Sequence, residues 1–406
     1  YVTQHVTTDE LEEIQRTLEC ACLLHDVGHP PFSHLSEGFL DEGALRERVV
    51  DTGLVDAFDS AGVGGAPLRS ASPHELLGCV IIVEEYGDAL RAFDVDPFEV
   101  CACVLGYSLA FERGEPWQYG VGAQLLHSPI DVDRLDYITR DNYMTGAGVL
   151  SFDVERMVDA YTAHPEEGLA LSEKALSTIG NYLEGRIALY MWVTQHHKSV
   201  YANRLLQAML GEYAAETGES PVTVDGILDR ELDDNAVLER LRVAARENPD
   251  STLASMYDRF RGRRFPATCW KHRIALADRV GSDLDDGLGE GGRDGKEDGE
   301  RLDEFTAWLT EGDDRLERLL ADALDVPVHE VWIDRSYVPA YDPDELEDIP
   351  IAYGGTTRSV GDWGLYGDRA FDVPIPFVFV PDGTKRQAIR VLREAFEREV
   401  GGRPRS

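Results

Sequence analysis

The chain has 406 residues, enough for one large helical domain with an appendage or for two or three domains. It has no apolar run of about 18 residues and no charged-then-apolar leader, so we expect neither a membrane span nor a secretory signal, and a cytoplasmic location. Its 76 acidic and 39 basic residues give a formal net charge of −37, which would repel phosphate and excludes a general nucleic-acid-binding protein.

The first predicted element is a helix over residues 9–26, DELEEIQRTLECACLLHD. Apolar side chains recur at helical spacing at positions 11, 14, 18, 21 and 24, behind an acidic first turn. This helix must end near Gly28, because Pro30 and Pro31 cannot continue it and Pro30 disfavours helical geometry at His29. The sequence therefore predicts a polar turn, HDVGHPPFSHLSEG, directly after an apolar helix.

The rest of the first half is also predicted to be helical. Helical periodicity recurs over residues 73–92, 97–112, 122–127, 134–142, 153–160 and 172–213. Further along, residues 281–304 are rich in Gly and Asp and have almost no apolar content, which indicates a flexible insertion. We predict that this insertion lies within a helical extension over residues 216–325.

From about residue 326 the sequence changes to strand patterns. VHEVWID, IPIAY and IPFVFVP are typical of short strands, and GTKRQAIRVLREAFEREV is typical of an amphipathic helix. The predicted fold class is therefore mainly α, with an all-helical core over residues 1–215 and a small α+β subdomain over residues 326–406.

The turn after the first helix gathers side chains that bind metals. His25 and His29 lie about one helical turn apart, and Asp26 adjoins His25. Imidazole nitrogen combined with carboxylate oxygen suits Mn, Fe, Co or Ni, and suits Mg less well. A His-Asp pair alone is more often structural, so the prediction of a divalent metal site depends on the other polar clusters.

A second polar cluster lies in DVDRLDYITRDNY, residues 131–143. Asp131 is explained as an acidic residue that complements the start of a helix, but Asp136 and Asp141 come later in the predicted helix, next to apolar residues in the sequence, and this explanation does not cover them. A third segment, SPHELLGCVI, begins like an ordinary helix N-terminus at residues 72–75, and its His74 taken alone is explained as a surface residue.

Three segments together resemble a known superfamily. LLHDVGHPPFSH, PHE and DVDRLDYITRDNYMTG are similar to the HD-domain phosphohydrolases, in particular to the branch of the SAM-and-HD-domain deoxynucleoside triphosphate triphosphohydrolases and the dGTPases. The resemblance covers about residues 15–210. It implies a helical HD domain, a divalent metal ion, a nucleotide substrate and a homo-oligomer. It also implies hydrolysis at the α-phosphate, which releases nucleoside and triphosphate.

The same resemblance implies roles for individual residues. The implied metal ligands are His25, Asp26 and Asp133. The implied catalytic residues around the reacting phosphate are His29, His34, Glu37 and His74, with a His and a Glu assisting the attacking water as in the dGTPases. The implied substrate contacts are Arg134 to phosphate, Tyr137 and Asp141 to the sugar, and Arg186 and Tyr190 to the triphosphate. Tyr190 also fits a packing face of its helix.

The N-terminal part of the sequence departs from this pattern. Members of the superfamily carry a further metal-ligand His, often preceded by an Arg, one helix before the His-Asp pair. Residues 1–24 contain His5 alone, and the neighbours of His5 do not match. Because the chain begins with Tyr1 and not with Met, we expect that a segment supplying this His and a phosphate-binding Arg is missing.

The proposed chemistry is coherent, but alternatives stay open at this point. A metal with open coordination positions polarises a phosphoryl oxygen and lowers the pKa of bound water, and histidines exchange protons near neutral pH. The chain could also be an HD phosphohydrolase for another nucleotide or phosphoester, or a non-catalytic nucleotide-binding regulator.

Lysine usage indicates the conditions for which the surface is adapted. Five of the 39 basic residues are Lys, and an Asp- and Glu-rich, Lys-poor composition resembles that of proteins from salt-in halophiles. The Debye length of about 3 Å at molar salt would screen the self-repulsion of such a surface.

Overall fold

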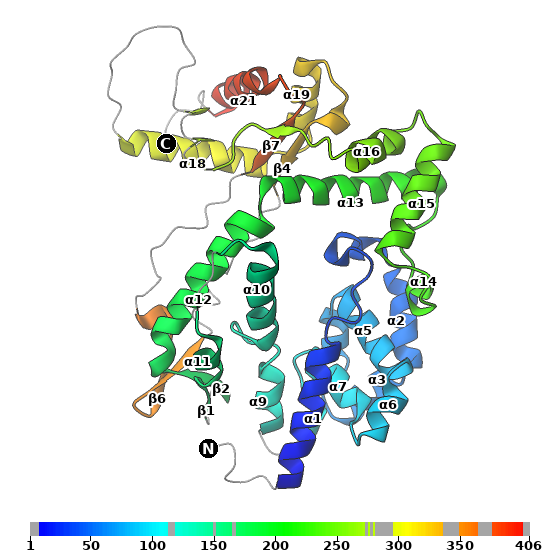
Figure 1. Ribbon diagram of the computed structural model, residues 1–406, viewed down its shortest axis with the longest axis vertical. Coiled ribbons are helices and arrows are strands. Elements are labelled where there is room, and N and C mark those ends of the chain that lie inside the picture. Colours follow the sequence, from blue (N-terminus) through cyan, green and yellow to red (C-terminus); the bar gives the residue numbers. More distant parts are fainter. Residues whose placement is uncertain are drawn as a thin grey trace. The chain divides into compact units, whose positions relative to one another are not determined.

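The computed structural model describes residues 8–112, 118–148, 152–164, 168–272, 275–276, 279–280, 295–335, 349–363 and 376–400. Contacts divide the chain into two compact units. Unit 1 comprises Tyr1–Leu189, Leu205–Asp258 and Tyr341–Arg369. Unit 2 comprises Tyr190–Arg204, Arg259–Ala340 and Ala370–Ser406. Figure 1 shows the elements of both units, coloured along the chain.

Unit 1 consists mainly of helices. α1 (Thr8–Leu24) packs against α7 (Pro97–Val104), and α7 packs against α5 (Pro73–Glu84). Leu76, Leu77 and Ile82 of α5 and Val100 of α7 are buried, so the apolar faces of these helices form a core. The other described helices of unit 1 are α2 (Glu42–Asp51), α3 (Leu54–Ser60), α4 (Ala66–Ser70), α6 (Gly87–Ala92), α8 (Leu109–Glu112), α9 (Gln118–Gln124), α10 (Val132–Thr145), α11 (Val154–Val158), α12 (Leu176–Leu189), α14 (Val224–Leu228) and α15 (Asp234–Glu247).

A four-stranded sheet completes unit 1. Its strands are β1 (Tyr161–His164), β2 (Gly168–Ser172), β5 (Pro350–Tyr353) and β6 (Thr356–Ser359), in the order β1-β2-β5-β6. β2 and β5 run parallel, with Leu171 opposite Ile351, and the other two pairs are antiparallel. The strand predicted from IPIAY is confirmed. Its pairing with a hairpin of the first half is a non-local contact, and periodicity did not indicate it.

The long helix predicted over residues 172–213 is interrupted. β2 ends at Ser172, α12 spans Leu176–Leu189, and a π-helical turn over Tyr190–Thr194 precedes α13 (His197–Thr217). The prediction of one continuous helix is therefore wrong. A π-helical turn keeps the side chains near helical spacing, so an apolar pattern does not reveal it. α13 and α16 (Thr252–Arg261) each contain residues of both units.

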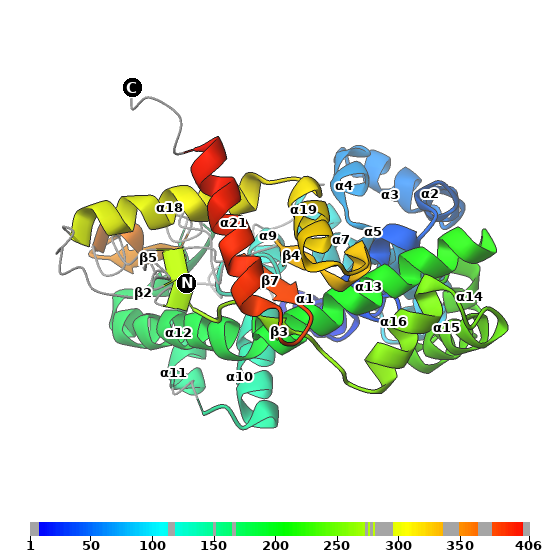
Figure 2. The ribbon, with the colours of Figure 1, turned by 90° about the horizontal axis from the view of Figure 1, so that it is seen from above.

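Unit 2 is a small α+β structure. Its sheet has the order β3-β7-β4, formed by β3 (Ala267–Thr268), β7 (Phe377–Val380) and β4 (Trp332–Asp334), with both pairs antiparallel. α18 (Gly295–Glu311), α19 (Arg315–Leu324) and α21 (Lys385–Glu399) contribute to the same core, which includes Phe305, Leu320 and Phe396. Figure 2 shows α21, in red, near α19 and β7. The predicted strand IPFVFVP and the predicted terminal helix are confirmed as β7 and α21, whereas VHEVWID forms a 3-10 turn over Val328–Glu330 before the short strand β4.

The predicted fold class, mainly α with a small α+β portion, is confirmed among the described residues. The predicted boundaries at residues 215 and 325 differ from the limits of the two units, because β5 and β6 pair within unit 1 whereas β4, β7 and α21 belong to unit 2.

Residues 281–294 of the predicted insertion lie outside the described residues. The last part of the predicted insertion, from Gly295 onward, is helical, because α18 begins there. None of the described helices combines the length and the apolar character that a membrane span requires.

Candidate metal centre and active site

The polar turn predicted after the first helix begins as α1 ends. α1 stops at Leu24, and the chain continues through two 3-10 turns, Ser33–Leu35 and Glu37–Phe39. At Gly28 this turn lies against α5 so closely that a Cβ atom would meet Gly78 N and His74 O at 2.1 Å. Glycine alone permits this approach, which places the turn beside the helix that carries His74.

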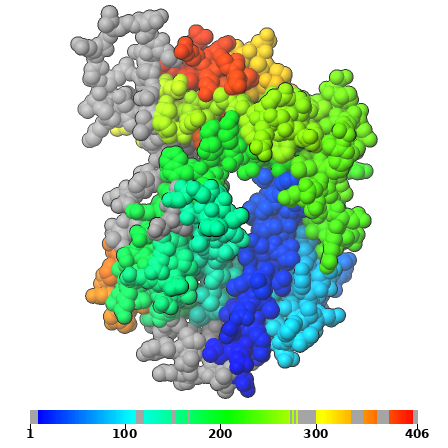
Figure 3. Space-filling model, viewed as in Figure 1, coloured from blue at the N-terminus to red at the C-terminus, as the bar shows by residue number. Residues whose placement is uncertain are grey.

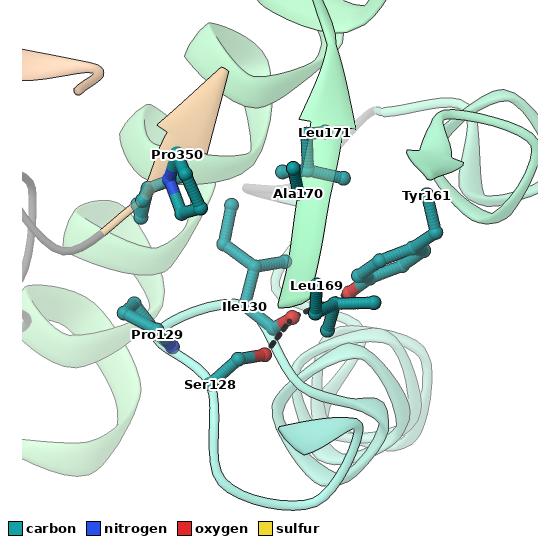
Figure 4. A pocket seen from close by; sticks show the side chains of 9 residues that line it. Ser128, Pro129, Ile130, Tyr161, Leu169, Ala170, Leu171 and Pro350 are labelled. Carbon is teal, nitrogen blue, oxygen red and sulfur yellow. Dashed lines mark hydrogen bonds between the residues drawn. The ribbon is translucent and has the colours of Figure 1, made fainter. Parts of the chain in front are cut away.

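A second element of the site is the start of α10. Asp131 caps the helix, since its side chain accepts a hydrogen bond from Arg134 N at 2.7 Å. In the preceding loop, Ser128 Oγ donates to Ile130 O at 2.8 Å and Tyr161 OH donates to the same oxygen (Figure 4). These bonds fix the first turn of α10, where Asp133 lies.

His25, Asp26 and Asp133 come together between these two elements. His25 Nδ1 donates to Cys22 O at 2.8 Å, which leaves Nε2 of the same ring to bind a proton or a metal ion. His25 Nε2 is buried and has no hydrogen-bond partner, while Asp26 Oδ1 and Asp133 Oδ1 lie 3.3 and 3.4 Å away. One ligand atom from each of the three residues lies within 4.8 Å of the others. Figure 3 shows α1 in blue and α10 in blue-green at the surface of the same face.

The electrostatics of this group favour a cation. Asp133 raises the pKa of His25 to about 9 against the opposing effect of burial, with further help from Cys22 O and Asp26. His29 lowers the pKa of the Asp26 carboxyl below its usual value, although burial again opposes this. Two ionised carboxylates and an imidazole nitrogen in one place form a donor set that fits a divalent transition metal. A metal ion bound there would take the place of the proton that His25 otherwise holds.

A second cluster surrounds one oxygen of Glu37. Glu37 Oε1 lies 2.5 Å from His34 Nδ1, 3.1 Å from His74 Nδ1 and 4.0 Å from His29 Nδ1. The rings of His29 and His74 stack with centroids 4.2 Å apart, and His34 packs edge-on against both. Ser33 Oγ is hydrogen-bonded to His29 Nδ1 at 3.0 Å. All three imidazoles are therefore held by specific contacts.

This second cluster is arranged for proton exchange. Partial burial opposes ionisation of Glu37, but the hydrogen bonds from His74 and His34 outweigh it and lower the pKa of the carboxyl. The ionised Glu37 accepts from His34 Nδ1–H, which orients the ring with its Nε2 edge away from the carboxylate. The His34 side chain is 72% exposed and that of Glu37 is 14% exposed, so the imidazole faces solvent with the carboxylate behind it.

One contact joins the two clusters. His29 Nε2 lies 3.3 Å from Asp26 Oδ1, so the same carboxylate borders the candidate metal ligands and the imidazole cluster. The structure thus assembles, from three separate segments of the chain, the seven residues that the resemblance implies as ligands or catalytic groups.

The residues predicted to contact substrate lie in different surroundings, and their roles stay predictions. Tyr137 and Asp141 follow Asp133 at intervals of four residues on α10, so they share a face of that helix. The Arg134 guanidinium bonds the Asp131 carboxylate and donates to Ser128 O at 2.9 Å, within its own helix turn and the adjoining loop. Arg186 is 5% exposed, and Tyr190 belongs to unit 2.

Sequence reasoning missed the residues that hold the imidazoles in place. The helix N-terminus predicted at residues 72–75 is confirmed and contains a capping box between Ser72 and Glu75, but Ser72 Oγ also lies 3.0 Å from His74 Nδ1. Ser33 has the corresponding role for His29. A Ser two or four residues from a candidate His was the available signal. The contact between Gly28 and Gly78 had no signal in the sequence, because it depends on how α5 packs.

No family model matches the chain. Among curated proteins, an uncharacterized protein from Mycoplasma pneumoniae is 25% identical over 199 residues, 47% of this chain and 38% of that protein. An uncharacterized protein from Bacillus subtilis is 27% identical over 194 residues, 47% of this chain and 35% of its own length. A Dictyostelium discoideum protein named a deoxynucleoside triphosphate triphosphohydrolase SAMHD1 homolog is 24% identical over 195 residues, 47% of this chain and 33% of its own length. The matched segment thus spans about a third of the length of these relatives.

Two solved structures share the fold. A phosphohydrolase from Bacteroides thetaiotaomicron aligns with a TM-score of 0.53 and 18% identity, over 93% of this chain and 81% of its own. A hypothetical protein from Aquifex aeolicus aligns with a TM-score of 0.56 and 17% identity, over 96% of this chain and 82% of its own. At this level of identity, the likeness is one of fold.

Proposed function

We propose that the chain is a metal-dependent phosphohydrolase that converts deoxynucleoside triphosphates to deoxynucleoside and triphosphate. The observation that carries this proposal is the 3.3 Å contact between Asp26 and His29, which joins the candidate metal ligands to the imidazole cluster. A phosphoryl group bound beside this contact would have a cation site on one side and proton-exchanging groups on the other.

The names of two similar proteins support the proposal. The Bacteroides neighbour in fold is named a phosphohydrolase, and the Dictyostelium relative is named a deoxynucleoside triphosphate triphosphohydrolase homolog. The residues implied to read the sugar, Tyr137 and Asp141, lie on the same helix as Asp133. A nucleotide bound with a phosphate at the metal centre would therefore extend along α10.

In the proposed reaction, water attacks the α-phosphorus and the bond between this phosphorus and the 5′-oxygen breaks. A bound divalent cation supplies positive charge that polarises a phosphoryl oxygen and acidifies water. The proton lost by water and the proton gained by the 5′-oxygen pass through the imidazole cluster. Glu37 fixes the orientation of His34 and stabilises its positive charge while the ring carries a proton.

A product assay with isotopic label tests this reaction. Each dNTP, NTP and deoxynucleoside monophosphate is incubated with the protein and Mn²⁺ or Mg²⁺ at molar salt, in water enriched in ¹⁸O. We expect equimolar deoxynucleoside and triphosphate, with the label in triphosphate, because the water oxygen joins phosphorus.

Two results would contradict the proposal in different ways. If the protein hydrolysed a monophosphate or another phosphoester but no dNTP, it would still be a phosphohydrolase. Triphosphohydrolase activity would then be excluded. No turnover by protein with a full complement of bound metal would instead favour a nucleotide-binding regulator.

The Glu37→Gln variant tests the contribution of the imidazole cluster to catalysis separately from the contribution of the metal ligands. The amide cannot accept two imidazole N–H bonds with the strength of a carboxylate, and general acid–base groups contribute about 10²- to 10⁴-fold to rates. We expect kcat to fall within that range while the metal content, measured by plasma mass spectrometry, stays unchanged. A loss of bound metal in this variant would mean that Glu37, with its three histidines, is itself a metal site.

A further inference from the structure

The loop that carries His29, His34 and Glu37 contains an unusual backbone conformation. Phe32 and Ser33, between the two histidines, have φ angles of 64° and 53°. Non-glycine residues rarely adopt this left-handed region, and a bulky residue such as Phe does so only where its surroundings hold it there. A change in the backbone angles of Phe32 would rotate the chain that follows it. This turn therefore sets the position of His34 relative to His29.

Hydrogen bonds within the loop hold both sides of this turn: His29 N donates to Asp26 O at 3.1 Å before it, and Leu35 N donates to Phe32 O at 3.2 Å after it. Ser33 N donates to Pro30 O at 2.7 Å, and Ser36 Oγ donates to Pro31 O at 2.5 Å. The first bond closes a turn over residues 30–33 and the second links Ser36 back to Pro31, but neither involves the N–H group of Phe32.

The Phe32 N–H group is bound from a distant part of the chain. It donates at 2.9 Å to Oδ1 of Asp234, which lies 202 residues later at the first position of α15. A second bond from the same region reaches the end of the loop, where Ser220 Oγ donates to Phe39 O at 2.8 Å. All four residues belong to unit 1.

The position of Asp234 at the start of its helix could also be explained by a role in capping that helix, but the structure assigns the cap to another residue. An acidic residue in a first helical turn is commonly a cap or complements the helix dipole. In α15 the cap is Asp233, whose side chain accepts from Ala236 N at 2.7 Å. Asp234 therefore directs its oxygen to the loop without being needed as the cap.

We propose that Asp234 is a positioning residue, which holds the left-handed turn at Phe32 and thereby keeps His29 and His34 in place around Glu37. This inference rests on the proposed function for its catalytic consequence. It also assigns a task to the helical region after residue 216, for which the sequence indicated none. The loop of the active site would be ordered by α15, and a ligand or mutation that moves α15 would alter catalysis without touching the metal ligands.

The test compares Asp234→Ala with two matched variants. Asp234→Asn keeps an acceptor oxygen for Phe32 N–H, and Asp233→Ala removes the cap of the same helix but no contact of the loop. Hydrogen–deuterium exchange of a peptide over residues 27–40 reports on the turn, and kcat and KM with dNTP report on catalysis.

We expect Asp234→Ala to speed hydrogen–deuterium exchange in this peptide by about tenfold or more. We also expect kcat to fall about 10- to 100-fold with KM little changed, because small misplacements of reacting groups have effects of this size. Asp234→Asn should restore most of both values. Asp233→Ala should lower the melting temperature but leave exchange in the loop and kcat near those of the parent protein.

The inference is overturned if Asp234→Ala exchanges and turns over like the parent protein, or if Asp233→Ala reproduces its losses, because the effect would then come from α15 stability alone. If the parent protein hydrolyses no dNTP but the exchange pattern is as expected, the proposed function fails and the attachment of the loop by Asp234 stands.

Discussion

Asp133→Asn is expected to remove the metal from the protein and nearly all hydrolytic activity with it. Asp133 supplies one of two carboxylates around His25 Nε2, and the neutral amide is a weaker ligand for a divalent cation. Changes to groups that merely support a ligand weaken metal binding about 10- to 100-fold, so we expect at least about 100-fold here. Because the cation contributes several kcal/mol, kcat/KM should fall about 10³-fold or more.

Asp136→Asn is the matched control for this variant. Asp136 lies three residues further along α10, is 64% exposed and pairs with Arg140 at 3.1 Å. Such exposed pairs are worth about 1 kcal/mol or less, so this variant should bind metal and turn over like the parent protein. Equal losses in both variants would show that α10, and not the Asp133 carboxylate, was damaged.

A second measurement on Asp133→Asn does not depend on activity. In protein treated with a chelator, NMR titration should give His25 a pKa of about 9, because Asp133 stabilises the protonated ring. Without the Asp133 carboxylate, the pKa of His25 should fall. An unchanged pKa would mean that the two side chains do not face each other in solution, and the proposed ligand set would then be wrong.

The local part of the site could be predicted from the sequence. Pro30 and Pro31 predict that the first helix ends before them, and α1 ends at Leu24; the residue types around the prolines indicate metal and proton chemistry. The face of α10 that carries Asp133 and Tyr137 follows from helical spacing alone. The helix that ends before the prolines and the face shared along α10 are found because each depends on residues that are neighbours in the sequence, whereas the metal and proton chemistry stays a prediction.

The contacts that assemble the site lie beyond such reasoning. Asp234 and Phe32 are far apart in the sequence, and no periodic pattern connects one exposed Asp to one backbone N–H group. The pairing of β2 with β5 is non-local in the same way. Helical periodicity predicts which face of an element is buried but not which element covers it, so the supporting contacts of the site required the structure.

Gly28→Ala is expected to have the largest effect on stability of any single methyl group in the loop. The added Cβ would overlap backbone atoms, namely Gly78 N and His74 O at 2.1 Å, and no rotation of a side chain can relieve that overlap. Either α5 or the turn after α1 must move. We expect the free energy of unfolding, measured by denaturant titration, to fall by about 3 kcal/mol or more, the upper end of the usual cost of overpacking.

The same change should also disassemble the active site, because the contact at Gly28 is where the turn with His25 and Asp26 meets the helix with His74. Gly38→Ala is the control: a Cβ at Gly38, in the same loop, would meet nothing within 4 Å. We expect that variant to stay within about 0.5 kcal/mol of the parent protein. If Gly28→Ala were as stable and active as Gly38→Ala, α5 could not lie against the turn as closely as the structure has it. The arrangement of His74 with Glu37 would then have to be different as well.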